Sequence, residues 1–490
     1  MWDAFLLIRG DYMSKELEKK WGLPTALAMV IGIVIGSGIF FKAVKVLSLT
    51  NGNMRNALLV IGIVGLICII CSSVFAILGK KYYKCNGLID YAEATCGKKY
   101  AYFIGWFSST VYNPVIAATL SYIAAAYFCM MIGLDMYGQA NTGFSILFVF
   151  IIIVINMLSP KLAGKIQVST TVIKLTPIVL MGVIGSIIGI INGNGIEVFQ
   201  IAQTANASSG FDGVFAGVCA FAFAYEGWIS ATTINSELKN PQRDLPLALI
   251  IGGIFCTLIY MLYVYSMSAT LTPTEIIACG DNLPKITFSN VFGNVAGNVI
   301  LAFIVISCLG TANGMTMCTL RGFYSLAIRD KGPKPQALST VDETTGMPLV
   351  SSIVGIGLIG FWLFQFSTLC MQGPLVYNGT HNPEWLLAWE ADEIIIVTMY
   401  ILYVPIFLSM IIKEKELNVF KRFVLPILSI ICSIFMSYCA YVAYGIQTVY
   451  YLVTFVIIQG IGMYFYRDKH FYDYFREVRN RRRKRKSINQ

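Results

Sequence analysis

The sequence predicts an all-α polytopic membrane protein of twelve transmembrane helices, in which two inverted repeats of five helices are followed by two extra helices. Of the 490 residues, 57% are hydrophobic and 13% are charged, whereas a soluble domain carries about 25% charged residues. Apolar runs of bilayer-spanning length recur along the whole chain. The first and sixth runs contain helix-breaking residues, a pattern typical of inverted-repeat transporters.

Runs of about 20 apolar residues mark the spans. In order along the chain they cover residues 23–41, 56–78, 100–129, 144–158, 168–191, 211–234, 245–271, 295–328, 349–369, 394–412, 424–443 and 449–466. The third and eighth runs are long, which predicts tilt or a helical extension into water. A segment at 1–22 precedes the first span, and a basic tail at 467–490 follows the last.

The lysines and arginines are distributed unevenly between the loops. With the N-terminus placed in the cytoplasm, all but five of the 36 Lys and Arg residues fall in inside segments. The outside segments hold Lys42, Lys45, Arg55 and Lys285, and Lys174 lies within a span. Because cationic loops resist translocation, this asymmetry predicts a multi-pass protein of twelve spans with both termini in the cytoplasm.

Composition also limits the classes of function. The 13 cysteines are mostly scattered through the spans, so we expect no disulfide framework. The two histidines, His381 and His470, lie in aqueous segments, and we find no zinc motif or nucleotide-binding loop. We therefore expect neither an enzyme nor a metal or other cofactor. The basic tail is interpreted as an anchor behind the last span rather than a segment that binds nucleic acid or anionic lipid.

The first span is interrupted at Ile35-Gly36-Ser37-Gly38-Ile39-Phe40. Glycine costs about 1 kcal/mol against alanine in a helix, and backbone groups freed within a bilayer need a partner. A half-helix that starts near Gly38 directs free N–H groups at the gap, and Ser37 adds a hydroxyl donor, which together suit a carboxylate. The carbonyls near Val34 and Ile35 suit an ammonium. The alternative interpretation is close helix packing through small residues.

The sixth span carries the second break, at Phe223-Ala224-Tyr225-Glu226-Gly227-Trp228. Carbonyls near Phe223 and Glu226 are candidate acceptors for an amine, and the Phe223 ring is a candidate cover for the substrate. Tyr225 and Trp228 are candidates to shape the pocket around it. Because the breaks lie five spans apart, the predicted repeats are 23–191 and 211–412, and the added helices lie at 424–466.

Two charged residues lie away from the ends of their spans, where charge is costly. A lysine such as Lys174 at the centre of a helix costs at least about 2.5–3.5 kcal/mol on insertion scales. We interpret it as a fixed cation near the site or a proton carrier, against a structural tie to backbone carbonyls, and expect Pro177 to loosen the backbone nearby. Glu226 has four interpretations: a partner of Lys174, a contact for a substrate cation, a proton carrier, or a protonated hydrogen-bonded group.

These motifs resemble those of the amino acid–polyamine–organocation permeases, especially the L-amino acid transporter branch and its bacterial serine/threonine-exchanger relatives. The resembling segments are Ile35-Gly36-Ser37-Gly38-Ile39-Phe40, Gly164-Lys165-Ile166-Gln167 leading to Lys174, Phe223-Ala224-Tyr225, Gly227-Trp228, Glu237-Leu238-Lys239-Asn240-Pro241 and Ser307-Cys308-Leu309-Gly310-Thr311-Ala312-Asn313-Gly314. The resemblance covers all twelve spans in order. It implies a LeuT-like fold of two inverted five-helix repeats that works by alternating access.

The resemblance also implies roles for individual residues. The substrate carboxylate would be held by Ser37, Gly38 and Ile39. The amine would be held by the carbonyls of Val34, Phe223 and Glu226, with Phe223 as the outer gate. In sodium-coupled relatives an ion bridges spans one and eight, and in this branch a lysine of span five fills that place. Lys174 therefore implies sodium independence, with Thr311 as its hydroxyl neighbour.

Two departures from the family pattern affect what the resemblance implies. Animal members have glycine where this chain has Glu226, while some bacterial members have a carboxylate, so large-neutral specificity does not transfer directly. Animal members also join a single-span glycoprotein, the heavy chain, through a cysteine outside span three. The loop 131–142 has no cysteine, so we do not predict that partner.

The favoured function is a secondary transporter that exchanges neutral L-amino acids across the plasma membrane without sodium. Proton-coupled symport through Lys174 or Glu226 is the alternative within the class. A membrane sensor that binds an amino acid without transporting it is the alternative from another class. The expected partners are the L-amino acid and the lipid bilayer, and nucleic acid is not among them.

Overall fold

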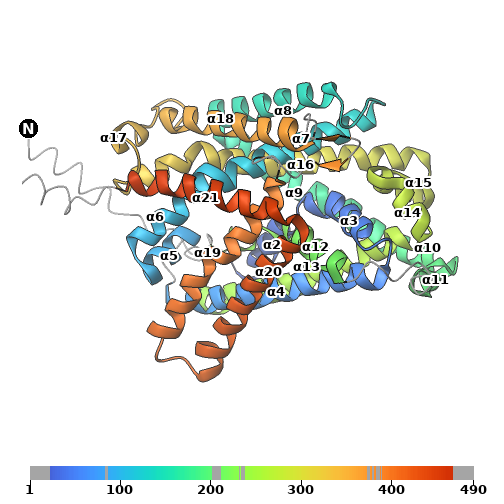
Figure 1. The fold of residues 1–490 in the computed structure, drawn as a ribbon, viewed down its shortest axis with the longest axis horizontal. Coiled ribbons are helices and arrows are strands. Elements are labelled where there is room, and N and C mark those ends of the chain that lie inside the picture. Colours follow the sequence, from blue (N-terminus) through green and yellow to red (C-terminus); the bar gives the residue numbers. More distant parts are fainter. Residues whose placement is uncertain are drawn as a thin grey trace, which may run out of the picture.

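The fold is seen in a computed structural model that describes residues 22–82, 87–200, 211–230, 232, 238–371, 376–377, 380–381, 387 and 389–466 (Figure 1). The predictions for the basic tail at 467–490, and for all but the last residue of the segment at 1–22, lie outside the described residues. The spans follow in the order of the sequence, and short helices connect them.

The first six spans are built from nine α-helices and three π- or 3₁₀-helical segments. They are α2 (Leu23–Val34) with α3 (Gly38–Leu49), α4 (Met54–Lys81), α6 (Lys98–Phe107) with η1 (Ser108–Tyr112) and α7 (Asn113–Met131), α8 (Gln139–Leu158), α9 (Pro160–Leu180) with η2 (Met181–Gly185) and α10 (Ser186–Ile191), and α12 (Phe211–Ala222) with η4 (Phe223–Tyr225). The break of the first span therefore separates α2 from α3, and that of the sixth follows η4.

The remaining spans are mostly continuous. They are α13 (Pro241–Ser268), α16 (Asn294–Ala327), α18 (Leu349–Phe364) with η7 (Gln365–Met371), α19 (Ala391–Lys413), η8 (Phe420–Val424) with α20 (Leu425–Tyr444), and α21 (Ile446–Tyr464). The connecting elements are α5 (Leu88–Cys96), α11 (Asn194–Gln200), α14 (Pro273–Cys279), η6 (Gly280–Asn282), α15 (Leu283–Phe292), α17 (Pro335–Leu338), β1 (Val376–Tyr377) and β2 (Thr380–His381). The two short strands pair antiparallel.

The described residues contain 11 helices long and apolar enough to cross a membrane, together with the pair α2 and α3, which is bent by 50° at its break. Counting that pair as one span gives the twelve that the sequence predicts. The third and eighth spans are long, as expected, at 34 residues each. The division into two inverted repeats stays a prediction.

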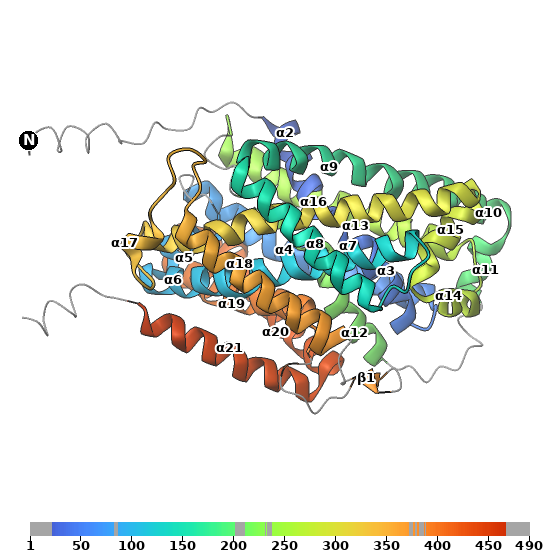
Figure 2. The same cartoon turned by 90° about the horizontal axis from the view of Figure 1, so that it is seen from above.

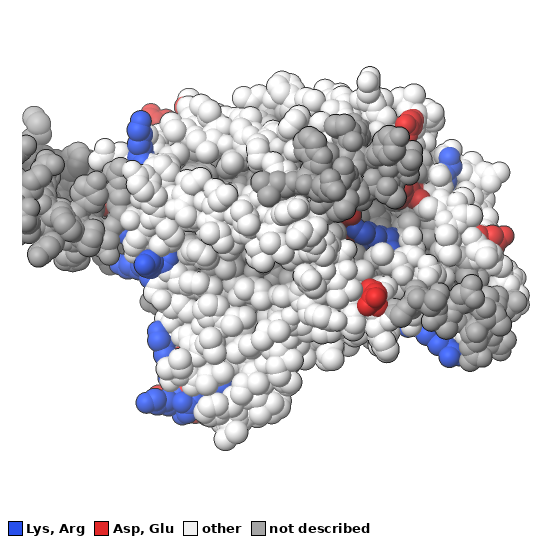
Figure 3. All heavy atoms as spheres, viewed as in Figure 1, with Lys and Arg blue, Asp and Glu red and all other residues white. Residues whose placement is uncertain are grey.

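The long helices run roughly along the long axis of the molecule (Figures 1 and 2). One end carries α5, α6 and α17, and we call it the α17 end. The opposite end carries α10, α11, α14 and α15, and we call it the α14 end. In the view of Figure 3, Lys and Arg gather at the α17 end, whereas most Asp and Glu lie toward the α14 end.

Two local features bear on the sequence predictions. Pro177 lies inside α9, and hydrogen bonding changes to the π-helical type at Met181, four residues later. This matches the expected loosening, since proline lacks the N–H that an α-helix uses. The 12 described cysteines are free, including Cys68 and Cys71, whose CxxC spacing lies buried within α4.

Candidate functional site

The two helix breaks meet each other in the interior. A Cβ atom added at Gly38 would lie 3.0 Å from both the Cα of Ala224 and the Cδ1 of Phe223. Gly227 has a φ of +105°, and a Cβ there would lie 2.9 Å from a methyl carbon of Ile33 in α2. Each break therefore needs a glycine so that the other segment can approach. The close packing through small residues, which was the alternative interpretation, occurs here together with the broken backbone.

The first break has the boundaries that the sequence predicts. Helix α2 ends at Val34, and Ile35 leaves the helical conformation with a ψ of 88°. Helix α3 begins at Gly38, with Ser37 at the N-cap position but without a capping hydrogen bond from its side chain. The side chain of Ser37 therefore accepts no hydrogen bond from the first N–H groups of α3. An anion at the helix start could accept from these N–H groups instead.

Two buried polar atoms at the breaks, Ser37 Oγ and Glu226 Oε2, have no nitrogen or oxygen hydrogen-bond partner. The thiol of Cys308 lies beside Ser37 but supplies no nitrogen or oxygen partner. An unsatisfied buried polar group costs about 1–3 kcal/mol. The junction of the two breaks therefore favours a polar ligand that would satisfy these atoms.

Tyr260 of α13 joins the two breaks through its hydroxyl group. The hydroxyl oxygen lies 2.9 Å from the carbonyl oxygen of Val34 and 2.8 Å from that of Ala224. One hydroxyl donates one hydrogen, so it serves these two acceptors in turn or as a shared bond. The sequence analysis missed this residue, because a tyrosine in an apolar span has the same signature as any aromatic core residue.

The predicted amine acceptors are consequently not all free. The carbonyl of Val34 accepts from Tyr260, and the carbonyl of Phe223 accepts from the N–H of Glu226 at 3.2 Å. A carbonyl oxygen has two lone pairs, so each retains capacity for a second donor. Gly36 differs from Gly38, because a Cβ there would meet nothing closer than 3.8 Å.

Glu226 is held by Tyr112 and not by Lys174. The hydroxyl of Tyr112, in the π-helical segment η1 of the third span, donates to Glu226 Oε1 at 2.5 Å. The other carboxylate oxygen, Oε2, is buried without a partner. Of the interpretations offered for Glu226, the ion pair with Lys174 is wrong for this conformation. Tyr112 carries no signal in the sequence beyond its place in a span.

Lys174 is buried on α9, with 4% of its surface exposed. Helix α9 packs against α16 and, more narrowly, against α2. Among the described residues, no carboxylate forms an ion pair with Lys174. Thr311 donates its hydroxyl hydrogen to the carbonyl of Ser307 within α16 at 3.1 Å, so that hydrogen is not directed at the lysine.

Two aromatic residues of the sixth span have core positions. The hydroxyl of Tyr225 donates to the carbonyl of Ile61 in α4 at 3.2 Å, and its ring packs on Tyr260. Trp228 packs on Phe75 and Tyr403. Both are almost fully buried. Tyr225 and Trp228 therefore pack the sixth-span break against the neighbouring helices α4, α13 and α19. Ile39, which is also fully buried, lies in the first turn of α3.

Phe223 and Phe41 form an aromatic pair on the α3 side of the breaks. Their ring centroids lie 5.6 Å apart, and 8% of the Phe223 surface is exposed. The Lys42 ammonium lies 5.3 Å from the centre of the Phe223 ring and 5.5 Å from that of Phe41. Phe223 lies against the first break at Gly38, and Phe41 lines a cavity.

A buried ion-pair cluster joins α3 to α19 beside this aromatic pair. Lys42 Nζ lies 2.7 Å from Asp392 Oδ2 and 2.5 Å from Glu393 Oε1. Lys45 Nζ lies 2.8 Å from Glu393 Oε1 and also contacts Glu390. The sequence analysis assigns Lys42 and Lys45 to an outside segment. In the structure α3 continues past Phe41 to Leu49 and α19 starts at Ala391, so the lysines and their carboxylate partners lie on helices or at a helix start.

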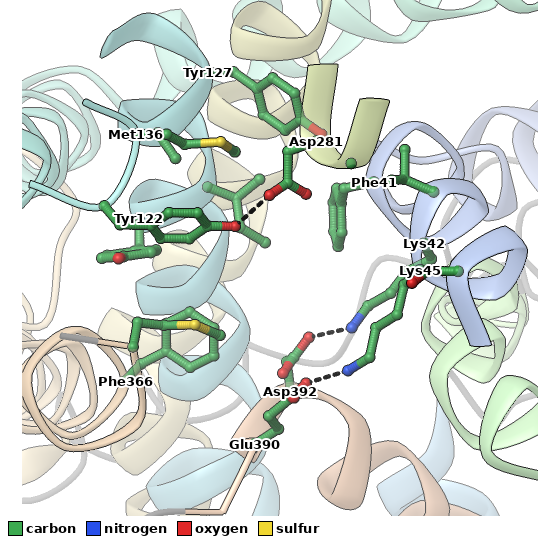
Figure 4. A pocket seen from close by; sticks show the side chains of 17 residues that line it. Phe41, Lys42, Lys45, Tyr122, Tyr127, Met136, Asp281, Phe366, Glu390 and Asp392 are labelled. Carbon is green, nitrogen blue, oxygen red and sulfur yellow. Dashed lines mark hydrogen bonds and ion pairs between the residues drawn. The ribbon is translucent and has the colours of Figure 1, made fainter. Parts of the chain in front are cut away.

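A cavity of about 370 Å³ lies between α3, α7, η6 and η7, next to the ion pairs (Figure 4). Its lining includes the following residues of both charges and several aromatic rings: Phe41, Lys42, Lys45, Tyr122, Tyr127, Tyr137, Asp281, Phe366, Glu390 and Asp392. In Figure 4 the two lysine side chains extend from α3 toward Asp392 and Glu390. Sequence reasoning missed this cavity, because its walls come from six separate segments, which are α3, α7, the loop at 136–137, η6, η7 and the start of α19.

Comparison with known proteins agrees with this geometry. The sequence model of a family described as amino acid permease matches residues 22–464. The serine/threonine exchanger of Bacillus subtilis is 28% identical over 83% of this chain and 86% of its own length. The human b(0,+)-type amino acid transporter 1 is 26% identical over 92% of this chain and 88% of its own. The human large neutral amino acids transporter small subunit 2 is 26% identical over 77% of this chain and 71% of its own length.

The two glycines of the first break predict different responses to a methyl group. In Gly38→Ala the new Cβ presses on the backbone of Ala224, and overpacking of this kind costs about 1–3 kcal/mol. We expect amino acid uptake into proteoliposomes to fall at least about tenfold, which corresponds to about 1.4 kcal/mol. Gly36→Ala, the matched control, should stay within about twofold of wild type. Equal loss in both variants would contradict a specific contact at Gly38.

Tyr260 and Tyr263 form a matched pair on α13. Both are fully buried, but the Tyr263 hydroxyl has no hydrogen-bond partner. We expect Tyr260→Phe to lower the unfolding stability by about 1–3 kcal/mol and to slow amino acid transport, since it removes the donor shared by the two breaks. Tyr263→Phe should leave both unchanged. Thermal unfolding in detergent and uptake rates measure the two effects, and equal values for the two variants would show that the bridge has no role.

Proposed function

Because this chain belongs to the amino acid permease family, it is a membrane transporter and not an enzyme, and we propose that it exchanges neutral L-amino acids across the plasma membrane without sodium. The observation that carries this proposal is the junction of two broken helices, where glycines let the backbones meet and buried polar atoms lack partners. Such a junction suits a small zwitterion, since one gap offers both donors and acceptors.

In this proposal the substrate carboxylate binds at the start of α3. The N–H groups of Gly38 and Ile39 begin that helix, and the buried hydroxyl of Ser37 lies beside them. A helix start carries a partial positive charge, which favours an anion by about 0.3–1 kcal/mol and more when it is partly buried. The site is thus polarised before the substrate arrives.

The substrate ammonium would bind the carbonyls at the end of α2 and around η4. Val34, Phe223 and Glu226 supply these oxygens, and Tyr260 would give up part of its bond to Val34 when the ammonium binds. Phe223 would act as the outer gate, because its ring contacts both the first break at Gly38 and Phe41, which lines the cavity. The two predicted repeats, 23–191 and 211–412, would supply the alternating motion.

Sodium independence is proposed from Lys174. Its ammonium is buried on the helix that packs against both α16 and α2, without a carboxylate partner among the described residues. A fixed positive charge at that place repels a sodium ion and would make one unnecessary. The excess of Lys and Arg at the α17 end supports a cytoplasmic location of that end.

Proton-coupled uptake is the second candidate, and Glu226 favours it. A buried carboxylate that accepts a hydrogen bond from the Tyr112 hydroxyl is chemically able to take up and release a proton. A sensor without transport activity is the third candidate, and a heavy-chain partner is not proposed.

Exchange and proton coupling give opposite results in proteoliposomes. Exchange predicts that unlabelled amino acid inside accelerates the uptake of labelled amino acid at least about fivefold, with no effect of replacing sodium by choline. Proton coupling predicts uptake into empty vesicles that depends on an inward pH gradient. Uptake driven by a sodium gradient would contradict the assignment of Lys174, and acceleration only by a pH gradient would contradict exchange.

Lys174 has a matched control on its own helix. Lys165 also lies on α9 but is exposed. We expect Lys174→Ala to reduce exchange at least about tenfold while the protein still inserts and stays monodisperse, because the fixed charge acts in translocation. Lys165→Ala should exchange at the wild-type rate. Normal exchange by Lys174→Ala would contradict its role.

A further inference from the structure

The third span changes its helical hydrogen bonding directly before a proline. Segment η1 is π-helical, and the N–H of Asn113 bonds to the carbonyl of Ser108, five residues earlier. Pro114 follows in the first turn of α7. In an α-helix the carbonyl of Thr110 would accept from the N–H of residue 114, which a proline lacks. The proline therefore leaves the Thr110 carbonyl without its helical donor.

An indole group from another span supplies a donor to this carbonyl. Trp362 of α18 donates its Nε1 hydrogen to the carbonyl oxygen of Thr110 at 2.8 Å. The bond is buried, and only 2% of the Trp362 surface is exposed. Because a backbone carbonyl inside a bilayer needs a partner, this one bond satisfies the group that the proline released and fastens η1 to α18.

Local contacts hold the same segment in place. The hydroxyl of Ser109 donates to the carbonyl of Gly105 at 2.8 Å, and the hydroxyl of Thr110 donates to the carbonyl of Trp106 at 2.7 Å. A Cβ atom added at Gly322 of α16 would lie 2.8 Å from Ser109 Oγ and 3.2 Å from the Cα of Ser109, so α16 packs directly on η1. The segment is therefore fixed by both α16 and α18.

The last residue of η1 reaches the break of the sixth span. Tyr112 donates its hydroxyl hydrogen to Glu226 Oε1 at 2.5 Å. Glu226 is the residue at which the chain leaves η4, with an extended backbone at φ −67° and ψ 152°, and its N–H donates to the carbonyl of Phe223. Gly227 follows with its positive φ. Tyr112 therefore restrains the residue at which the sixth span stops being helical.

We propose that Trp362 is a positioning residue for substrate binding, which acts through η1 and Tyr112 on Glu226. Its indole fixes η1 at the Thr110 carbonyl, and η1 holds Tyr112 against the Glu226 side chain. This restraint keeps in place the Glu226 carbonyl that is proposed to bind the substrate ammonium. Single π-helical turns are frequent at functional sites, and here the turn links a distant span to the break. The proposal rests on the proposed binding of an amino acid at the two breaks.

Trp362→Phe removes the indole donor and keeps an aromatic ring, and Trp106→Phe is its matched control. Trp106 lies one turn before Thr110, is 5% exposed, and donates its indole hydrogen to the carbonyl of Ile458 at 2.9 Å. That carbonyl belongs to α21, which carries neither η1 nor a break. Both substitutions should lower the thermal unfolding temperature by similar amounts, since each removes one indole–carbonyl bond.

The Michaelis constant separates positioning from stability. In reconstituted full-length protein loaded with unlabelled L-alanine, we expect Trp362→Phe to raise KM for labelled L-alanine at least about fivefold, with kcat per folded transporter within about twofold of wild type. Trp106→Phe should leave both within about twofold. Tyr112→Phe should raise KM as much as Trp362→Phe, and the double variant should raise it no further, because both act on one contact. Additive effects, or an unchanged KM in Trp362→Phe, would overturn the proposal.

Infrared spectroscopy of the purified protein tests the positioning without transport. The carboxyl band of Glu226 is the one lost in Glu226→Gln, and its frequency reports the hydrogen bond from Tyr112. Tyr112→Phe and Trp362→Phe should shift this band in the same direction, and Trp106→Phe should leave it unchanged. If L-alanine is not exchanged but both variants shift the band, the proposed function fails and the positioning of Glu226 stands. If exchange is normal and Trp362→Phe changes neither the band nor KM, the positioning fails alone.

Discussion

The structure depends on one constraint, which is that backbone groups released by a helix break inside a bilayer need partners. Two breaks that lie far apart in the sequence meet this constraint together, since glycines at 38 and 227 let the segments touch and Tyr260 supplies a hydroxyl to both. The groups that stay unpaired, Ser37 Oγ and Glu226 Oε2, then become the natural contacts for a substrate. Folding and binding use the same exposed backbone.

Charged side chains between α3 and α19 also satisfy one another inside the protein. Lys42, Lys45, Asp392 and Glu393 are individually poor membrane residues, but together they form a compact cluster that fastens α3 to α19. Breaking a buried pair leaves an uncompensated charge, which costs about 3–5 kcal/mol, although the intact pair contributes much less. The cluster therefore fixes the position of α3 beside the aromatic pair. Lys42, Lys45 and Asp392 of the cluster also line the adjacent cavity.

The sequence was sufficient for features that act locally. Composition predicted the twelve spans, and Gly36, Gly38 and Gly227 predicted both breaks to within a residue. It was insufficient where residues act in pairs over long separations. Lys42 and Asp392 are 350 positions apart, and hydropathy treats each as a charge in water. Tyr112 and Tyr260 are two of 27 tyrosines, and only their hydrogen bonds distinguish them from core aromatics.

Tyr260 gives the resting protein an internal competitor for its own ligand. Its hydroxyl already occupies the Val34 carbonyl that an incoming ammonium would use. The ammonium would share this acceptor with Tyr260 instead of gaining a free one, so the net gain is a fraction of the gross interaction. A carrier benefits from this loss of affinity, because a substrate that is held less tightly leaves sooner on the far side, and turnover improves at the expense of retention.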